Sequence, residues 1–229
     1  MGPREGIKAV LWDLDDTLYS RKAAAEKVFH GMFRELLYPS RDEEYISRAV
    51  SYMMKCVRPN SMVSEEAFTE LLKKYQPELP FSRPDCLDYY YAHMPDFAVP
   101  YPTHIKIIKR LRSLGIKNAI VTNIYPERVA AQRAKIKALG IEDLFEEIII
   151  SGEIGIRKPD RGIYDLAASR LGVKNSECIF VGDDPGSDIK GAIGADMEAV
   201  WLDVWGYGNI FQDEPRVHRV SSLEEYFLL

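Results

Sequence analysis

Three carboxylates follow an apolar run near the start of the chain. The run Ala-Val-Leu-Trp at positions 9–12 ends in Asp13, Leu14, Asp15 and Asp16. Asp13 and Asp15 are two residues apart on extended chain, so their side chains point to the same side. Carboxylates this close need a cation beside them, or one of them must hold a proton. Oxygen ligands suit a hard cation, and few protein ligands together with a phosphate group suit Mg²⁺.

Polar residues also follow three later apolar runs of the chain. In chain order these residues are Thr122, Asn123, Lys158, Asp183, Asp184 and Asp188. Lys158 would neutralise an anionic substrate, and the Thr122 hydroxyl would donate a hydrogen bond to it. Together with the first carboxylates, these residue types predict a site for phosphoryl transfer through a carboxylate nucleophile.

The elements that must position these residues alternate along the chain. Apolar runs lie at 7–12, 118–122, 147–150, 178–181 and 199–202, and segments with helical spacing lie at 104–114, 127–139, 161–171 and 185–193. Short apolar runs between helices predict a buried parallel sheet of about five strands, covered on both faces. We therefore predict an α/β fold with a doubly wound, Rossmann-like parallel sheet. Ligands of such sheets bind beyond the carboxyl ends of the strands, where the polar residues converge.

Three of the predicted helices stop at the pair Leu-Gly followed by Ile or Val. The glycines are Gly115, Gly140 and Gly172. Glycine takes the left-handed conformation without steric cost, and the apolar residue after it packs back against the helix. The pattern predicts a helix end at each of these glycines.

The segment 20–98 has a different pattern and shows no strand run. Its helical spacing lies at 21–37, 42–55, 64–75 and 86–93, separated by prolines. The sequence therefore predicts an all-helical domain, 20–98, inserted into an α/β core domain made of 1–19 and 99–229.

Four short motifs in this order resemble those of the haloacid dehalogenase-like (HAD) superfamily. They are Asp13-Leu14-Asp15-Asp16-Thr17, Val121-Thr122-Asn123, Lys158-Pro159, and Gly182-Asp183 followed by Asp188. Each motif lies at the end of a predicted strand or just after it. The helical insert lies between the first two motifs, where this superfamily carries its type-one helical cap domain.

The resemblance implies roles for the catalytic and metal-binding residues. Asp13 would attack phosphorus and form an aspartyl-phosphate. Asp15 would protonate the leaving alcohol and then deprotonate the hydrolytic water. Mg²⁺ would be held by Asp13, the backbone carbonyl of Asp15 and Asp183. Thr122 and Lys158 would bind the transferred phosphoryl oxygens.

The resemblance also implies supporting roles. Asn123 belongs with the substrate-binding residues of the second motif. Asp188 would orient Lys158 or a metal-bound water, and Thr17 would support the turn of the first motif. Asp184 stands where relatives often carry a small residue, so it either lies in the outer shell of the metal or faces water. Asp196 stands where relatives usually carry Gly, and Asp tolerates the left-handed conformation better than most residues.

The function that follows is a Mg²⁺-dependent phosphatase of a small phosphorylated metabolite. A phosphosugar mutase similar to β-phosphoglucomutase is the first alternative, since it would use the same aspartyl-phosphate. A 2-haloacid dehalogenase needs neither Mg²⁺ nor the acid at Asp15, and a non-catalytic binding module usually lacks one of the motif residues. Both are therefore less favoured than the phosphatase.

Composition narrows the partners and the compartment. The 229 residues carry a formal net charge of -5, which argues against a nucleic-acid partner. No window approaches the roughly 20 apolar residues of a membrane span. The first eight residues lack the apolar stretch of a signal peptide, and the three cysteines form no CxxC pair. We therefore expect a cytoplasmic protein whose partner is a small phosphorylated metabolite.

Overall fold

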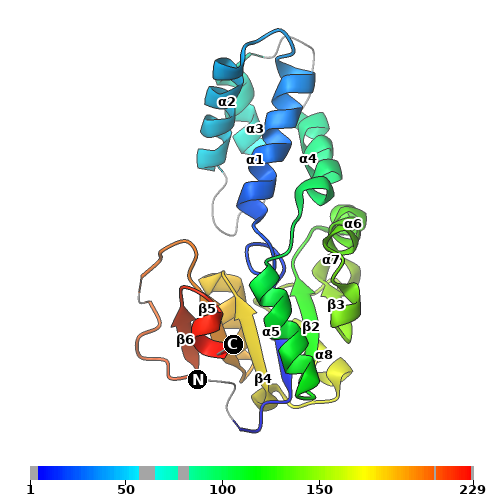
Figure 1. The fold of residues 1–229 in the computed structure, drawn as a ribbon, viewed down its shortest axis with the longest axis vertical. Helices are drawn as coiled ribbons and strands as arrows, with labels where there is room; N and C mark the ends of the chain where they lie inside the picture. The colour runs from blue at the N-terminus through cyan, green and yellow to red at the C-terminus, as the bar shows by residue number, and fades with distance from the viewer. Residues whose placement is uncertain (1–4, 57–64, 77–82, 209, 228–229) are drawn as a thin grey trace. The chain divides into compact units, whose positions relative to one another are not determined.

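A computed structural model describes residues 5–56, 65–76, 83–208 and 210–227. The chain forms two compact units (Figure 1), which are Met1–Ser20 with Pro100–Leu229, and Arg21–Val99. The first unit is an α/β structure and the second is helical. In the described part of the chain, no helix is both long and apolar enough to cross a membrane.

The first unit contains a parallel sheet in which the first strand is central. Its described strands are β1 (Ala9–Trp12), β2 (Lys117–Thr122), β3 (Glu147–Ile150), β4 (Cys178–Gly182), β5 (Glu198–Leu202) and β6 (Val217–Val220). Their order is β3-β2-β1-β4-β5-β6, so the chain winds outward from β1 in both directions. The doubly wound α/β fold is confirmed.

The predicted number of strands was one too low. The sixth strand, β6, pairs in parallel with β5 at the edge of the sheet. Its sequence is Val-His-Arg-Val, and only Val220 of its four residues is buried. An edge strand with an exposed side needs no continuous apolar run, which is why the sequence pattern missed it.

Helices cover both faces of the sheet. On one face, side chains such as Leu11 and Phe180 join a core with α8 (Arg161–Leu171) and α9 (Lys190–Gly194). On the other face, Trp12 stacks on Phe227 of α10 (Glu224–Phe227) with ring centroids 5.9 Å apart. Helix α5 (Pro102–Ser113) packs against β2 and against α10. Burial on both faces explains why the central strands read as unbroken apolar runs.

The predicted helix ends are confirmed at the three Leu-Gly pairs. Gly115, Gly140 and Gly172 have φ of +78°, +63° and +67°. Asp196 is also left-handed, with φ of +63°, as predicted for an Asp in that place. The remaining elements of this unit are α6 (Val129–Leu139), α7 (Ser151–Ile154), the 3₁₀ turns η2 (Pro126–Arg128), η3 (Glu142–Leu144) and η4 (Asn175–Glu177), and the π-helical turn η5 (Pro185–Ile189).

The second unit is built from helices around an aromatic core. Its elements are α1 (Arg21–Met32), the π-helical turn η1 (Phe33–Leu37), α2 (Glu43–Cys56), α3 (Glu65–Lys74) and α4 (Arg83–Phe97). Phe29 lies at the centre, with its ring centroid 5.4 Å from that of Tyr90 and 6.1 Å from that of Phe68. Helix α4 is longer than the predicted 86–93, and residue 64 of the predicted third helix lies outside the described residues.

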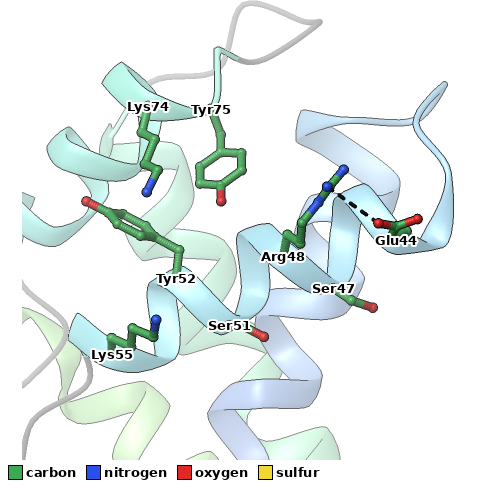
Figure 2. Close-up of a pocket in the computed structure, with 8 residues that line it drawn as sticks. All are labelled: Glu44, Ser47, Arg48, Ser51, Tyr52, Lys55, Lys74 and Tyr75. Atoms are coloured by element: carbon green, nitrogen blue, oxygen red, sulfur yellow. Dashed lines mark ion pairs between the residues drawn. The ribbon is translucent and has the colours of Figure 1, made fainter.

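A surface pocket of about 380 Å³ lies on this helical unit, between α2 and α3 (Figure 2). Its lining residues are Glu44, Ser47, Arg48, Ser51, Tyr52, Lys55, Lys74 and Tyr75. The Lys74 ammonium lies 4.3 Å from the centroid of the Tyr52 ring, and Arg48 pairs with Glu44 across one turn of α2. None of the four motifs contributes to this pocket, so we assign it no part in the chemistry.

Candidate active site

The carboxyl ends of β1, β2 and β4 bring the motif residues to one edge of the sheet. These strands are neighbours, with Trp12 in register with Ile120 of β2 and with Val181 of β4. The backbone N–H of Asp13 continues the ladder by donating to the Val181 carbonyl at 2.9 Å. Asp13, Thr122 and Asp183 therefore lie at the carboxyl ends of three neighbouring strands.

Lys158 connects the first and the last motif. Its Nζ lies 2.5 Å from Asp13 Oδ1 and 2.8 Å from Asp188 Oδ1, and its side chain is only 2% exposed. Burial by itself lowers the pKa of Lys158, but the carboxylates of Asp13 and Asp188 raise it above the ordinary value. Lys158 is therefore a fixed buried cation between two carboxylates.

The side chain of Asn123 holds the loop that carries Lys158. Asn123 Oδ1 accepts a hydrogen bond from the Lys158 backbone N–H at 3.0 Å. Asn123 Nδ2 donates to the Lys158 carbonyl at 2.9 Å. Both polar ends of this side chain are thus engaged with backbone, which makes it a support for Lys158 in the structure.

Asp13, Asp183 and Asp188 form a buried cluster of carboxylates. One oxygen from each lies within 4.8 Å of the others. Burial raises the pKa of Asp13 to about 7 against the attraction of Lys158, with Asp188 and Asp15 adding to the rise. Burial, together with Asp13 and Asp188, also raises the pKa of Asp183 well above its usual value. With one ammonium beside them, the three carboxyl groups cannot all ionise easily unless a further cation joins them, and oxygen donors of this kind suit Mg²⁺.

Two tryptophans anchor Asp183. Trp205 Nε1 donates to Asp183 Oδ2 at 2.9 Å, and Trp201 Nε1 donates to the Asp183 carbonyl at 3.0 Å. The sequence motifs did not point to either residue, since both lie beyond the fourth motif. A carboxylate with one oxygen held in this way keeps its other oxygen available to a cation.

Asp184 caps the turn that follows β4. Its side chain accepts hydrogen bonds from the Gly186 backbone N–H and from Ser187 Oγ, both at 2.6 Å. Its own backbone N–H donates to Asp188 Oδ2 at 3.1 Å. Asp184 thus shapes the turn that carries Asp188 to Lys158.

Gly182 leaves the space that Asp188 occupies. A Cβ at this position would lie 2.3 Å from Asp188 Oδ2 and 2.6 Å from Asp188 Cγ. Because Lys158 and the Asp184 backbone hold the Asp188 carboxylate, the Asp188 side chain cannot move away from the added Cβ. We expect Gly182→Ala to lower the free energy of unfolding by about 1–3 kcal/mol, measured by urea denaturation.

Gly194→Ala is the matched control for this prediction. Nothing lies within 4 Å of a Cβ at Gly194, which ends α9. We expect this variant to be unchanged or up to about 1 kcal/mol more stable. Equal unfolding midpoints for Gly182→Ala and Gly194→Ala would show that Asp188 does not need the space at Gly182.

The carboxylate of Asp15 lies outside the buried cluster and has its own partners. Lys135 Nζ lies 2.6 Å from Asp15 Oδ1, and the Tyr19 hydroxyl donates to the same oxygen. Gln132 Nε2 lies 3.3 Å from Asp15 Oδ2 and donates to Thr122 Oγ1 at 2.7 Å. Asp13 and Asp15, two residues apart, are thus paired with different buried lysines.

Sequence reasoning missed Gln132 and Lys135, although a signal was present. On α6 they share a stripe with Ile136 and Leu139, and all four side chains are buried. An amide and an ammonium on the apolar stripe of a helix demand polar partners. That pattern alone predicts that Gln132 and Lys135 contact polar groups inside the protein.

Thr17 lies in the turn after β1. It is fully buried, and among the described residues its Oγ1 has no hydrogen-bond partner. Its carbonyl accepts a hydrogen bond from His104 Nδ1 at 2.7 Å, and burial lowers the pKa of this histidine. Asp16 precedes it with φ of +58°, so the chain reverses sharply between the carboxylates and α1.

Comparison with known proteins shows the family. The family model for haloacid dehalogenase-like hydrolases matches residues 7–196. This chain belongs to the haloacid dehalogenase-like hydrolase family. The match spans all four motifs, from Asp13 in the first to Asp188 in the fourth.

Relatives of this HAD-like chain are similar over most of its length. A protein of Methanopyrus kandleri named glyceraldehyde 3-phosphate phosphatase is 35% identical over 202 residues, 85% of this chain and 83% of that protein. A protein of the same name from Methanocaldococcus jannaschii is 27% identical over 223 residues, 96% of this chain and 95% of that one. The crystal structure of the HAD-hydrolase YfnB from Bacillus subtilis, bound to magnesium, aligns with a TM-score of 0.77 at 19% identity, covering 96% of each chain.

Proposed function

We propose that this chain is a Mg²⁺-dependent phosphatase that hydrolyses a small phosphorylated metabolite through an aspartyl-phosphate on Asp13. The observation that carries the proposal is the buried Lys158, which contacts Asp13 and Asp188 within the carboxylate cluster. A phosphate group brought there would meet a nucleophile, a cation and a hydrogen-bond donor. Its enzyme class, a phosphoric monoester hydrolase, agrees with the names of its relatives.

Asp13 begins the reaction. One of its carboxylate oxygens bonds to phosphorus, and the bond from phosphorus to the ester oxygen breaks. Lys158 and the Thr122 hydroxyl hold the phosphoryl oxygens during this transfer. Because Gln132 donates to Thr122 Oγ1, the Thr122 proton points elsewhere and can serve the phosphoryl group.

Asp15 moves the protons. It gives a proton to the leaving ester oxygen, so that the product departs as a neutral alcohol. In the second step it takes a proton from the water that attacks phosphorus. The bond between phosphorus and Asp13 then breaks, which releases inorganic phosphate and restores the carboxylate.

Asp13, Asp183 and the backbone carbonyl of Asp15 would hold Mg²⁺. Asp188, whose two oxygens contact Lys158 and the Asp184 backbone N–H, would orient Lys158 beside them. The cation supplies charge that offsets the negative oxygens of the carboxylates and the phosphoryl group. The inserted helical unit, Arg21–Val99, is proposed as the cap domain that selects the leaving group.

An assay of phosphate release tests this proposal. The panel is p-nitrophenyl phosphate, D-glyceraldehyde 3-phosphate and O-phosphoserine, with Mg²⁺ and with EDTA. The second and third compounds are the substrates for which two relatives are named, at 35% and 34% identity over the aligned residues. We expect metal-dependent release from at least one of them. No release from any, by folded protein, would contradict the proposal.

Stabilisation by Mg²⁺ is expected to grow with pH. The pKa of Asp13 is raised to about 7 in the folded protein, so the fold favours its protonated form. This contribution to stability is complete below about pH 4 and is lost as the pH rises through about 7. Mg²⁺ competes with the same proton and replaces it as the partner of the cluster. The rise in Tm caused by Mg²⁺ should therefore be larger at pH 8 than at pH 5.5. An equal rise at both pH values would contradict this account.

Loss of the Trp205 indole N–H is expected to weaken Mg²⁺ binding. Trp205→Phe keeps an aromatic ring but removes the donor to Asp183 Oδ2. Loss of such a supporting hydrogen bond typically costs about 10–100-fold in metal affinity. Isothermal titration calorimetry of the metal-free protein measures the Kd for Mg²⁺, with Tyr207→Phe, an exposed neighbour in the sequence, as the control. An unchanged Kd in Trp205→Phe would remove this role.

A further inference from the structure

We propose that Tyr19, Gln132 and Lys135 form a positioning clamp, the Asp15 clamp, that holds the Asp15 carboxylate ready for proton transfer and away from the metal. The inference rests on the proposed function, since it concerns the residue that serves as acid and base there. Tyr19 follows the first motif, whereas Gln132 and Lys135 come from α6.

The Asp15 clamp contacts both oxygens of the carboxylate. Lys135 Nζ and the Tyr19 hydroxyl meet at Oδ1, and the Gln132 amide lies at Oδ2. The Lys135 ammonium also lies 5.4 Å from the centroid of the Tyr19 ring, so these two residues support each other. A carboxylate held at both oxygens loses the freedom to rotate about its side-chain torsions.

The clamp is built from buried groups. Tyr19 is fully buried, and Gln132 and Lys135 are 2% and 6% exposed. Burying an ammonium and an amide is costly unless their partners are in place, and Asp15 and Thr122 supply those partners. An ion pair at the surface would not require a buried lysine. The burial of Lys135 therefore indicates that its position beside Asp15 is fixed.

The chemistry gives a reason for the clamp. Asp13 and Asp15 are only two residues apart, and any free carboxylate there would be drawn to the cation. Donors on Asp15 compete with that attraction and hold its side chain apart from the cation, in one fixed position. Lys158 pairs with Asp13, the proposed nucleophile, and Lys135 pairs with Asp15, the proposed acid and base. Each carboxylate thus has its own lysine.

Gln132 adds a connection between the two substrate contacts. Its single amide nitrogen lies 2.7 Å from Thr122 Oγ1 and 3.3 Å from Asp15 Oδ2. The two hydrogens of this nitrogen serve one partner each. The donor to the phosphoryl group and the proton carrier are thereby held at a fixed separation.

The test is whether clamp variants lose activity on the same substrate as a variant of Asp15 itself. We would measure kcat/KM, which covers the first phosphoryl transfer, for p-nitrophenyl phosphate and for the best alkyl phosphate of the panel. Nitrophenolate leaves readily without a proton, whereas an alkoxide needs one. Asp15→Asn should therefore lose far more activity on the alkyl phosphate, and Lys135→Met should follow with roughly a 10–100-fold loss there against less than about 3-fold on p-nitrophenyl phosphate.

The same series includes the controls. Lys137→Met removes an exposed lysine two residues along α6 and should stay within about twofold of wild type. Lys135→Arg keeps the cation and should recover most of the loss. In the Asp15→Asn background, Lys135→Met should cause no further loss, because both changes act through one side chain. If Lys135→Met does not fold, Tyr19→Phe and Gln132→Leu should show the same preference for p-nitrophenyl phosphate.

Two results would overturn the Asp15 clamp. An equal loss on both substrates, or a loss that adds to that of Asp15→Asn, would mean that Lys135 acts only on the fold or on another residue. An increase in kcat/KM on the alkyl phosphate would mean that Lys135 restrains Asp15 from its task. Wild-type protein without activity on any compound would instead count against the phosphatase proposal, so the two failures are distinguishable.

Discussion

Asp13→Asn is expected to abolish turnover, with a fall in kcat of roughly 10⁴-fold or more. The amide has nearly the shape of the carboxylate but lacks the anionic oxygen that attacks phosphorus. The fold should persist, because the side chain still fits beside Lys158 and one of three crowded negative charges is removed. Phosphate release from the best substrate of the panel measures the effect, with circular dichroism as the check on folding.

Asp213→Asn is the control for that change. It makes the same substitution at an exposed aspartate far along the chain, and its kcat should match wild type. Activity of Asp13→Asn within tenfold of wild type would mean that another group attacks phosphorus. The aspartyl-phosphate would then have to be abandoned.

Lys158→Met is expected to lower both stability and activity. Methionine fills a similar volume, but Asp13 and Asp188 lose the cation they share. Breaking a buried ion pair from one side typically costs about 3–5 kcal/mol of unfolding free energy. The missing charge at the phosphoryl oxygens should lower kcat about 10³-fold. Urea denaturation without metal and phosphate release with Mg²⁺ measure the two losses.

Mg²⁺ should restore part of the stability of Lys158→Met, since it supplies positive charge to the same carboxylates. Lys190→Met, at an exposed lysine on α9, should lose neither stability nor activity. A Lys158→Met protein as stable as Lys190→Met in the absence of metal would show that the carboxylates do not depend on Lys158.

The strand-end residues could be predicted because the information is local. A run of apolar residues followed by Asp13 and Asp15 indicates both the strand and the side to which the carboxylates point. The same holds for Asp183 after β4. Parallel topology then brings these ends together without any knowledge of the contacts. The left-handed glycines at the helix ends were predictable for the same reason, since a single residue type decides the turn.

The residues that hold the site could not be predicted in that way. Gln132 and Lys135 reach Asp15 from 117 and 120 positions along the chain, and no motif connects them. Asn123 belongs to a motif, yet its side chain binds the Lys158 backbone, which depends on how two loops fold together. Trp205 contacts Asp183 from the segment after β5. Such contacts are decided by tertiary packing rather than by periodicity.

The most direct test of the central claim is to trap the phosphorylated residue. Enzyme turning over its best substrate with Mg²⁺ would be quenched and treated with borohydride, which reduces an acyl phosphate to an alcohol. Peptide mass spectrometry should then find homoserine in place of Asp13 and unmodified aspartate at Asp15, with neither change when substrate is omitted. Homoserine at a different position, or turnover with Asp13 always recovered as aspartate, would contradict the account.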